Sequence, residues 1–184
     1  MKYNGKYSMR KQLLTELSGN ARSGIGTRAE NVCRVFEGLP MTERHSAKGR
    51  PDVPTKKGEA ECKSITGTYK KIQIEVPKAQ LGNPPTSQEH LKNYIKNNPM
   101  IWGVVDNGDV YDVTRALKPT SSGKLTGFGA GGRLGHNYPV DLSKAKLVHK
   151  AAGHKYEKLI ADIMAGVPPK TAAANHNYPT LGDA

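Results

Sequence analysis

Apolar residues recur every three or four positions in several parts of the chain, and this spacing predicts amphipathic helices. The first of these helices is predicted to begin at Thr27, because Thr27 and Glu30 have the spacing of a capping box. Gly38 and Pro40 are predicted to end it. Its apolar stripe consists of Ala29, Val32, Cys33, Phe36 and Leu39. This stripe is expected to pack on a sheet.

Three further helices are predicted. Thr86 and Glu89 form a second capping-box pattern, and the helix that follows is expected to end at Asn98, before a proline. Its apolar stripe is Leu91, Tyr94 and Ile95. Residues 8–18 could form a short helix, and residues 154–165 predict another with Gly166 as its stop. The tail from residue 168 lacks a clear pattern.

The segments between the helices read as strands and turns. Strands are predicted near 52–53, over 59–65 and over 69–76, and a hairpin over 100–113. The segment 115–135 is expected to be irregular, and the tetrapeptide His-Asn-Tyr-Pro, which occurs at 136–139 and again at 176–179, is interpreted as coincidence or a turn preference. The order α-β-β-β-α-β-β predicts an α/β fold in which a mixed central β-sheet is flanked by helices.

Charge narrows the class of partner. The chain has 28 Lys and Arg against 16 Asp and Glu, a net charge of +12, and such a surplus favours nucleic acid as partner. The basic residues are dispersed, which argues against a membrane surface, and no apolar run is long enough to span a bilayer. Two cysteines form no disulfide framework, so a reducing cytoplasm is the expected location.

One segment, residues 50–63, carries the candidate chemistry. Two short strands joined at Lys56 and Lys57 would place Asp52 near the end of one strand and Glu61 on the other. Glu61 and Lys63 are two positions apart, so in a strand they project from the same face. Carboxylates suit Mg²⁺, which polarises a phosphoryl oxygen and lowers the pKa of a bound water. A neighbouring ammonium can position or deprotonate that water and offset charge on phosphorus.

The pair Pro51-Asp52, followed by Glu61-Cys62-Lys63, resembles the PD-(D/E)xK nuclease superfamily. The resemblance covers the motif and the element order helix–hairpin–strand–helix–strand over about residues 27–105. It implies a restriction-endonuclease-like core (αβββαβ), with Asp52 and Glu61 as ligands of Mg²⁺ (Mn²⁺ can substitute) and Lys63 assisting the attacking water. Glu30, on the preceding helix, matches the place of a further catalytic acid.

The expected function is therefore that of a Mg²⁺-dependent endodeoxyribonuclease of restriction or homing type, with a Holliday-junction resolvase as the alternative. A homodimer is expected, because cutting both strands needs two sites or two successive nicks. The chain is predicted to be a single nuclease domain over 1–184, with its core at about 27–114, a basic Gly-rich loop at 115–135, and a C-terminal helix and tail. Expected DNA contacts are Arg44, Lys48, Arg50, Lys56, Lys57, Lys70, Lys71, Lys124 and Arg133.

Other interpretations stay open. Asp52 could only begin a turn, while Glu61 and Lys63 form a solvated ion pair that contributes under ~1 kcal/mol; the protein would then be a non-catalytic basic nucleic-acid-binding protein. Glu30 could be only a helix cap, and Glu59 shares the predicted face of Glu61 and could compete for the metal. Weaker alternatives are an RNA-cutting site with His45, a His-Asn-His site, a phosphate-contacting loop over 127–135, and a role for Glu37.

Overall fold

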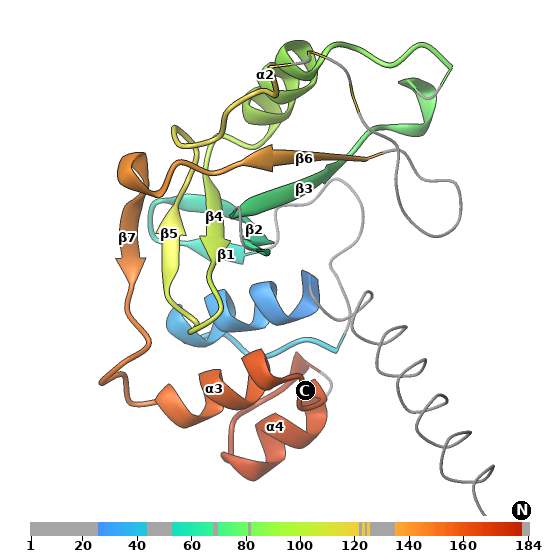
Figure 1. Cartoon of the computed structure of the whole chain (residues 1–184). Coiled ribbons are helices and arrows are strands. Elements are labelled where there is room, and N and C mark those ends of the chain that lie inside the picture. The colour runs from blue at the N-terminus through green and yellow to red at the C-terminus, as the bar shows by residue number, and fades with distance from the viewer. Residues whose placement is uncertain are drawn as a thin grey trace, which may run out of the picture.

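The computed structural model describes residues 26–43, 53–67, 70–80, 82–121, 123, 125 and 135–181. It is a mixed α/β structure built on a five-stranded sheet with the order β1-β2-β4-β5-β7 (Figure 1). The strands are β1 (Val53–Thr55), β2 (Gly58–Ser64), β4 (Ile101–Val104), β5 (Val110–Asp112) and β7 (Lys146–His149). The prediction of a mixed central sheet flanked by helices is confirmed.

The sheet is mixed because one of its connections is a helix. β1 and β2 form an antiparallel hairpin, and β4, β5 and β7 also pair antiparallel. β2 and β4 run parallel, with Lys63 opposite Gly103. Parallel neighbours need a long crossover connection, and here it includes α2 (Ser87–Asn97).

Two strands form a second sheet, which packs against the first. β3 (Lys71–Glu75) follows β2 and pairs antiparallel with β6 (Gly135–Pro139), so that Gln73 lies opposite Asn137. We call this pair of strands the ribbon. Two short 3₁₀ helices, η1 (Lys78–Gln80) and η2 (Leu142–Lys144), follow its strands.

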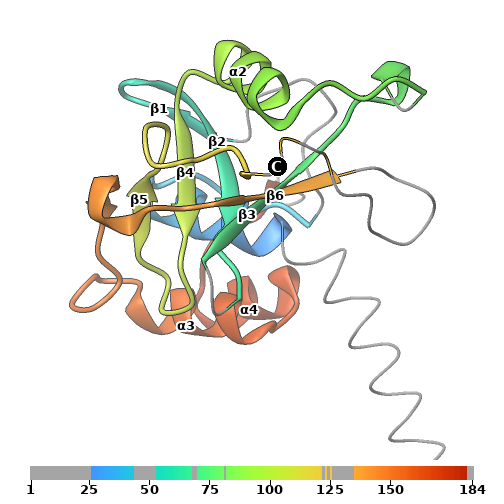
Figure 2. The same cartoon turned by 45° about the horizontal axis from the view of Figure 1, so that its top comes forward.

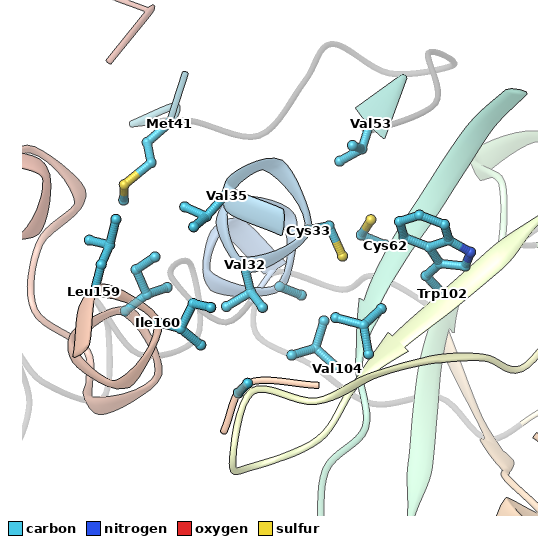
Figure 3. Packing of buried hydrophobic residues seen from close by; sticks show 14 of the residues in the cluster. Val32, Cys33, Val35, Met41, Val53, Cys62, Trp102, Val104, Leu159 and Ile160 are labelled. Atoms are coloured by element: carbon cyan, nitrogen blue, oxygen red, sulfur yellow. The ribbon is translucent and has the colours of Figure 1, made fainter. Parts of the chain in front are cut away.

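Two hydrophobic cores lie on the two faces of the five-stranded sheet. On one face, the helix over residues 26–36 packs with α3 (Glu157–Ala165) and α4 (Pro169–Asn175). Figure 3 shows Cys33 of that helix pointing toward Cys62 of β2. On the other face, α2 and the ribbon share a core with the sheet (Figures 1 and 2). Its buried members include Ile65, Ile72, Ile74, Leu91, Ile101 and Tyr138.

Of the two predicted capping boxes, one is correct and one is wrong. The Thr86–Glu89 capping box is confirmed: the backbone N–H of Glu89 donates to Thr86 Oγ1 (3.3 Å), and that of Thr86 donates to Glu89 Oε2 (3.1 Å). The Thr27–Glu30 box is wrong, because residues 26 and 27 are already helical and Thr27 is buried. Gly38 does terminate that helix, with a φ of 70°.

The C-terminal third departs most from the sequence prediction. Residues 136–139 belong to β6, residues 146–149 form β7, and the tail folds into α4, which Pro169 begins at its first position. α3 begins at Glu157 rather than at 154 and ends at Gly166 in the left-handed conformation, as expected. The helix predicted over 8–18 lies outside the described residues. In the part of the chain that the structure describes, none of the helices has the length and apolar character of a membrane span.

Candidate active site

The alternation of side chains along β2 divides its residues between the two cores. Ala60 and Cys62 are buried against the helix over residues 26–36. Glu61 and Lys63 project from the opposite face, where Lys63 Nζ lies 3.2 Å from Glu61 Oε1. The prediction that these two side chains share a face is confirmed. Ile65, two positions further along, is buried in the core beneath α2 and the ribbon.

A third polar group reaches the same carboxylate oxygen. The hydroxyl of Tyr94, on α2, donates a hydrogen bond to Glu61 Oε1 (3.0 Å). The helical pattern predicts Tyr94 as a core residue, and its ring is indeed partly buried in the core under α2. Only the rule that a buried tyrosine hydroxyl finds a partner could have pointed to its second role, and that rule does not name the partner.

The site is sheltered but open to solvent. The side chain of Glu61 is 15% exposed and that of Lys63 is 31% exposed. No described residue donates a hydrogen bond to Glu61 Oε2, since Lys63 and Tyr94 both contact Oε1. One oxygen of the carboxylate is thus held by the protein, and the other is available to a ligand.

The carboxylate of Glu61 belongs to the β1–β2 hairpin. The turn of this hairpin holds the exposed Lys56 and Lys57, and is closed by a hydrogen bond from the Thr55 hydroxyl to the carbonyl of Gly58 (2.5 Å). Gly58 has a φ of 121°, which favours glycine. Val53 pairs with Ala60, the residue before Glu61. Asp52 itself lies outside the described residues.

Glu30, in the preceding helix, and Glu37, just after that helix, have partners other than Glu61 and Lys63. Glu30 is 2% exposed, and its Oε1 lies 3.7 Å from Arg34 Nη1, one turn further along the helix. That helix packs on the face of β2 that carries Ala60 and Cys62. Glu37 contacts Nε2 of His149 through Oε1 (2.9 Å). The structure therefore gives both acids partners away from the Glu61–Lys63 pair.

The remaining predicted residues fall into two groups. Lys70 and Lys71 are partly exposed, where the chain enters β3, and Glu59 is exposed opposite Pro54 of β1. Five Arg and Lys residues that were predicted to contact DNA lie, with His45 and Asp52, outside the described residues. The predicted DNA contacts among them are Arg44, Lys48, Arg50, Lys124 and Arg133. His136 is buried on the inner side of the ribbon, away from solvent.

The described residues supply one carboxylate, that of Glu61, to the candidate site. Among the described residues, no three of His, Cys, Asp or Glu gather as a metal-binding group. Mg²⁺ does not need such a cage, because it keeps several waters and takes one or two carboxylates together with substrate phosphate. Glu61 Oε2 would be one ligand, and Asp52, beside Val53 in the chain, is the candidate for the second. Softer metals that prefer His and Cys find no such set in the described part.

Comparison of the chain with protein-family models, with curated proteins and with solved structures gives no match. The function is therefore inferred from the chemistry and placement of these side chains.

Proposed function

We propose that the protein is a Mg²⁺-dependent endodeoxyribonuclease whose active site is formed by Asp52, Glu61 and Lys63. One observation carries the proposal: Glu61 and Lys63 are in contact on one face of β2, with Glu61 Oε1 held and Oε2 available. In the sequence Asp52 precedes Val53, and Val53 pairs with Ala60, the residue before Glu61. The proposal thus assigns the carboxylates of Asp52 and Glu61 and the ammonium group of Lys63 to one site.

The order of elements supports the same proposal. A helix, the β1–β2 hairpin, strand β3, helix α2 and strand β4 follow one another, and this order is the one that resemblance to the PD-(D/E)xK superfamily implies. β3 pairs with β6 rather than within the five-stranded sheet. A restriction-endonuclease-like core is proposed on the order of the elements, and β3 is the strand that departs from it. Glu30 is left out of the proposed site, because its helix covers the other face of β2.

The proposed chemistry assigns each side chain a task. Asp52 and Glu61 would hold Mg²⁺, which when bound supplies Lewis acidity and a more acidic water. Lys63 donates from Nζ toward the phosphodiester, offsetting negative charge that grows on its oxygens, and orients the attacking water. Tyr94 holds Glu61 Oε1, so that Oε2 keeps one direction.

Affinity for DNA is proposed to come from the basic surface. Lys56 and Lys57 are exposed in the turn that leads into β2, the strand of Glu61 and Lys63, and the whole chain carries +12. Lysine contacts to phosphate release counterions, so binding is expected to weaken steeply with salt.

The test is cleavage of supercoiled plasmid, a four-way DNA junction and double-stranded RNA, with Mg²⁺ or with EDTA. We expect Mg²⁺-dependent cleavage of DNA by the wild type and its loss in Asp52→Asn and Lys63→Met. The matched control is Lys158→Met, which removes the same charge from an exposed position on α3, on the opposite face of the sheet, and is expected to keep wild-type activity.

Each other outcome of this experiment would lead to a different conclusion about the function. Preference for the junction would make the enzyme a resolvase. Equal cutting by Asp52→Asn, Lys63→Met and the wild type would contradict the proposed site. Tight, salt-sensitive DNA binding without cleavage under any of these conditions would favour a non-catalytic binding protein.

A further inference from the structure

The ribbon has one buried face and one polar face. Ile72, Ile74, His136 and Tyr138 point inward and are buried. Because side chains alternate along a strand, the residues between them form the outer face. These are Lys71, Gln73 and Glu75 of β3, and Gly135, Asn137 and Pro139 of β6.

Two amide side chains lie at the centre of the outer face. Gln73 and Asn137 are directly opposite each other in the antiparallel register. Gln73 is exposed, and Asn137 is partly exposed. Neither side-chain amide makes a hydrogen bond with any residue that the structure describes. On β6, Asn137 stands between Gly135, which is buried, and Pro139, which is partly exposed.

The ribbon lies on the same face of the sheet as the candidate site. Ile72 and Ile74 share a core with Ile65, which is two positions after Lys63 on the same face of the strand. Figures 1 and 2 show β3 and β6 beside α2, which carries Tyr94. A duplex placed against Glu61 and Lys63 would therefore have the ribbon close to it.

The dimensions and chemistry of the outer face match the major groove of DNA. A two-stranded ribbon enters a groove about 12 Å wide. Each strand of this one has 5 residues, which span about 17 Å, the length of about five base pairs. Gln and Asn can each pair in bidentate fashion with the adenine edge. Lys70, just before β3, is partly exposed and would attract a phosphate.

We propose that the outer face of the ribbon reads base edges in the major groove of duplex DNA, with Gln73 and Asn137 as the residues that determine sequence preference. This inference rests on the proposed function in taking DNA as the partner. The proposal also predicts that the protein prefers duplex DNA to double-stranded RNA, because the major groove of A-form RNA is too narrow and deep for side chains to read.

The test is selection of bound sequences from a randomised DNA duplex pool in EDTA, with the full-length wild type, Gln73→Ala and Asn137→Ala. We expect both variants to lose about 10- to 100-fold of discrimination at one or two base pairs. Affinity for unselected duplex and its salt dependence should stay within about 3-fold, because neither change alters charge. Asn175→Ala, which removes an exposed amide from α4 on the opposite face, is the matched control and keeps the wild-type preference.

Two further measurements keep the proposal falsifiable. Thermal unfolding should give nearly the same Tm for all variants, since neither amide is buried and neither makes a hydrogen bond with the residues that the structure describes. Gln73→Arg should move the preference from adenine toward guanine, which a misfolded variant would not do. A wild type without sequence preference, or ribbon variants that keep it, would overturn the proposal. Because selection in EDTA needs no cleavage, it tests the proposal for the ribbon separately from the nuclease reaction.

Discussion

At the scale of single residues, Glu61 is held by groups from two different elements. Lys63 comes from the same strand, and Tyr94 comes from the helix that connects β2 to β4. A carboxylate held at one oxygen loses rotational freedom before it meets a ligand, and such preorganisation contributes to metal binding and catalysis. An isolated surface ion pair would not need the second contact.

Tyr94→Phe tests this interpretation. Removing the hydroxyl should lower the single-turnover cleavage rate by about 3- to 10-fold, which corresponds to about 1 kcal/mol of lost positioning. The comparison is Tyr111→Phe, since Tyr111 is partly buried on β5 and its hydroxyl makes no hydrogen bond to the described residues. The prediction fails if both variants cleave at the same rate.

The sequence predicted the contact between Glu61 and Lys63 because it follows from a period of two in one strand. It did not predict Tyr94, because that contact joins residues 33 positions apart and depends on how α2 crosses the sheet. It also assigned Glu30 to a cap or to catalysis. The structure instead buries Glu30 within a helix that has already begun by residue 26.

At the scale of elements, a network of hydrogen bonds around the buried side chains of His90 and Tyr138 joins α2 to the ribbon. Nδ1 of His90 lies 2.6 Å from the Tyr138 hydroxyl and Nε2 lies 3.2 Å from the carbonyl oxygen of Glu75. Tyr138 also donates to the carbonyl of Ser87, at the start of α2. Burial lowers the pKa of His90 and of His136 and raises that of Tyr138, because each charged form loses hydration.

The lowered pKa of His90 predicts acid sensitivity. The folded state binds a proton less readily than the unfolded chain, where histidine titrates near 6.5. The stability that follows from this is therefore present above about pH 6.5 and is lost as the pH falls through the lower folded pKa, by at most about 1.4 kcal/mol per pH unit for one proton. Urea unfolding at about pH 7.5 and about pH 5.5 should show it.

The control for this pH effect is His90→Gln, which cannot titrate. Its unfolding midpoint should fall less than that of the wild type over the same interval, with the remaining decrease assigned partly to His136. Equal pH dependence in the two proteins would remove His90 from the explanation.

Elements with a complete local signal were predicted best. α2 has a capping box, an apolar stripe and a stop, and all three are found in the structure. β6 and β7 have short, mixed patterns whose pairing is decided by partners far along the chain, namely β3 and β5. α4 is a short, alanine-rich helix without a hydrophobic period of its own, and it forms by packing Ala172 and Ala173 into a core.

At the scale of the whole molecule, each face of the sheet has a hydrophobic core, and the proposed active site lies on only one of these faces. One face of β2 belongs to the core formed with the helix over residues 26–36 and α3. The other face carries Glu61 and Lys63, near α2 and the ribbon. Burial of apolar side chains on both faces stabilises the fold, and the proposed DNA contact uses the partly exposed polar side chains of the second face.

The most direct test of the proposed active site is a comparison of Glu61→Gln with Glu59→Gln in Mg²⁺-dependent plasmid cleavage. Both changes remove one carboxylate from the same strand, and alternation places both positions on the same face, but only Glu61 contacts Lys63 and Tyr94. We predict that Glu61→Gln lowers the cleavage rate by at least about 100-fold, as loss of a metal ligand should, and that Glu59→Gln stays within about 3-fold of the wild type. Equal rates for the two variants, or a larger loss in Glu59→Gln, would contradict the assignment of Glu61 to the active site.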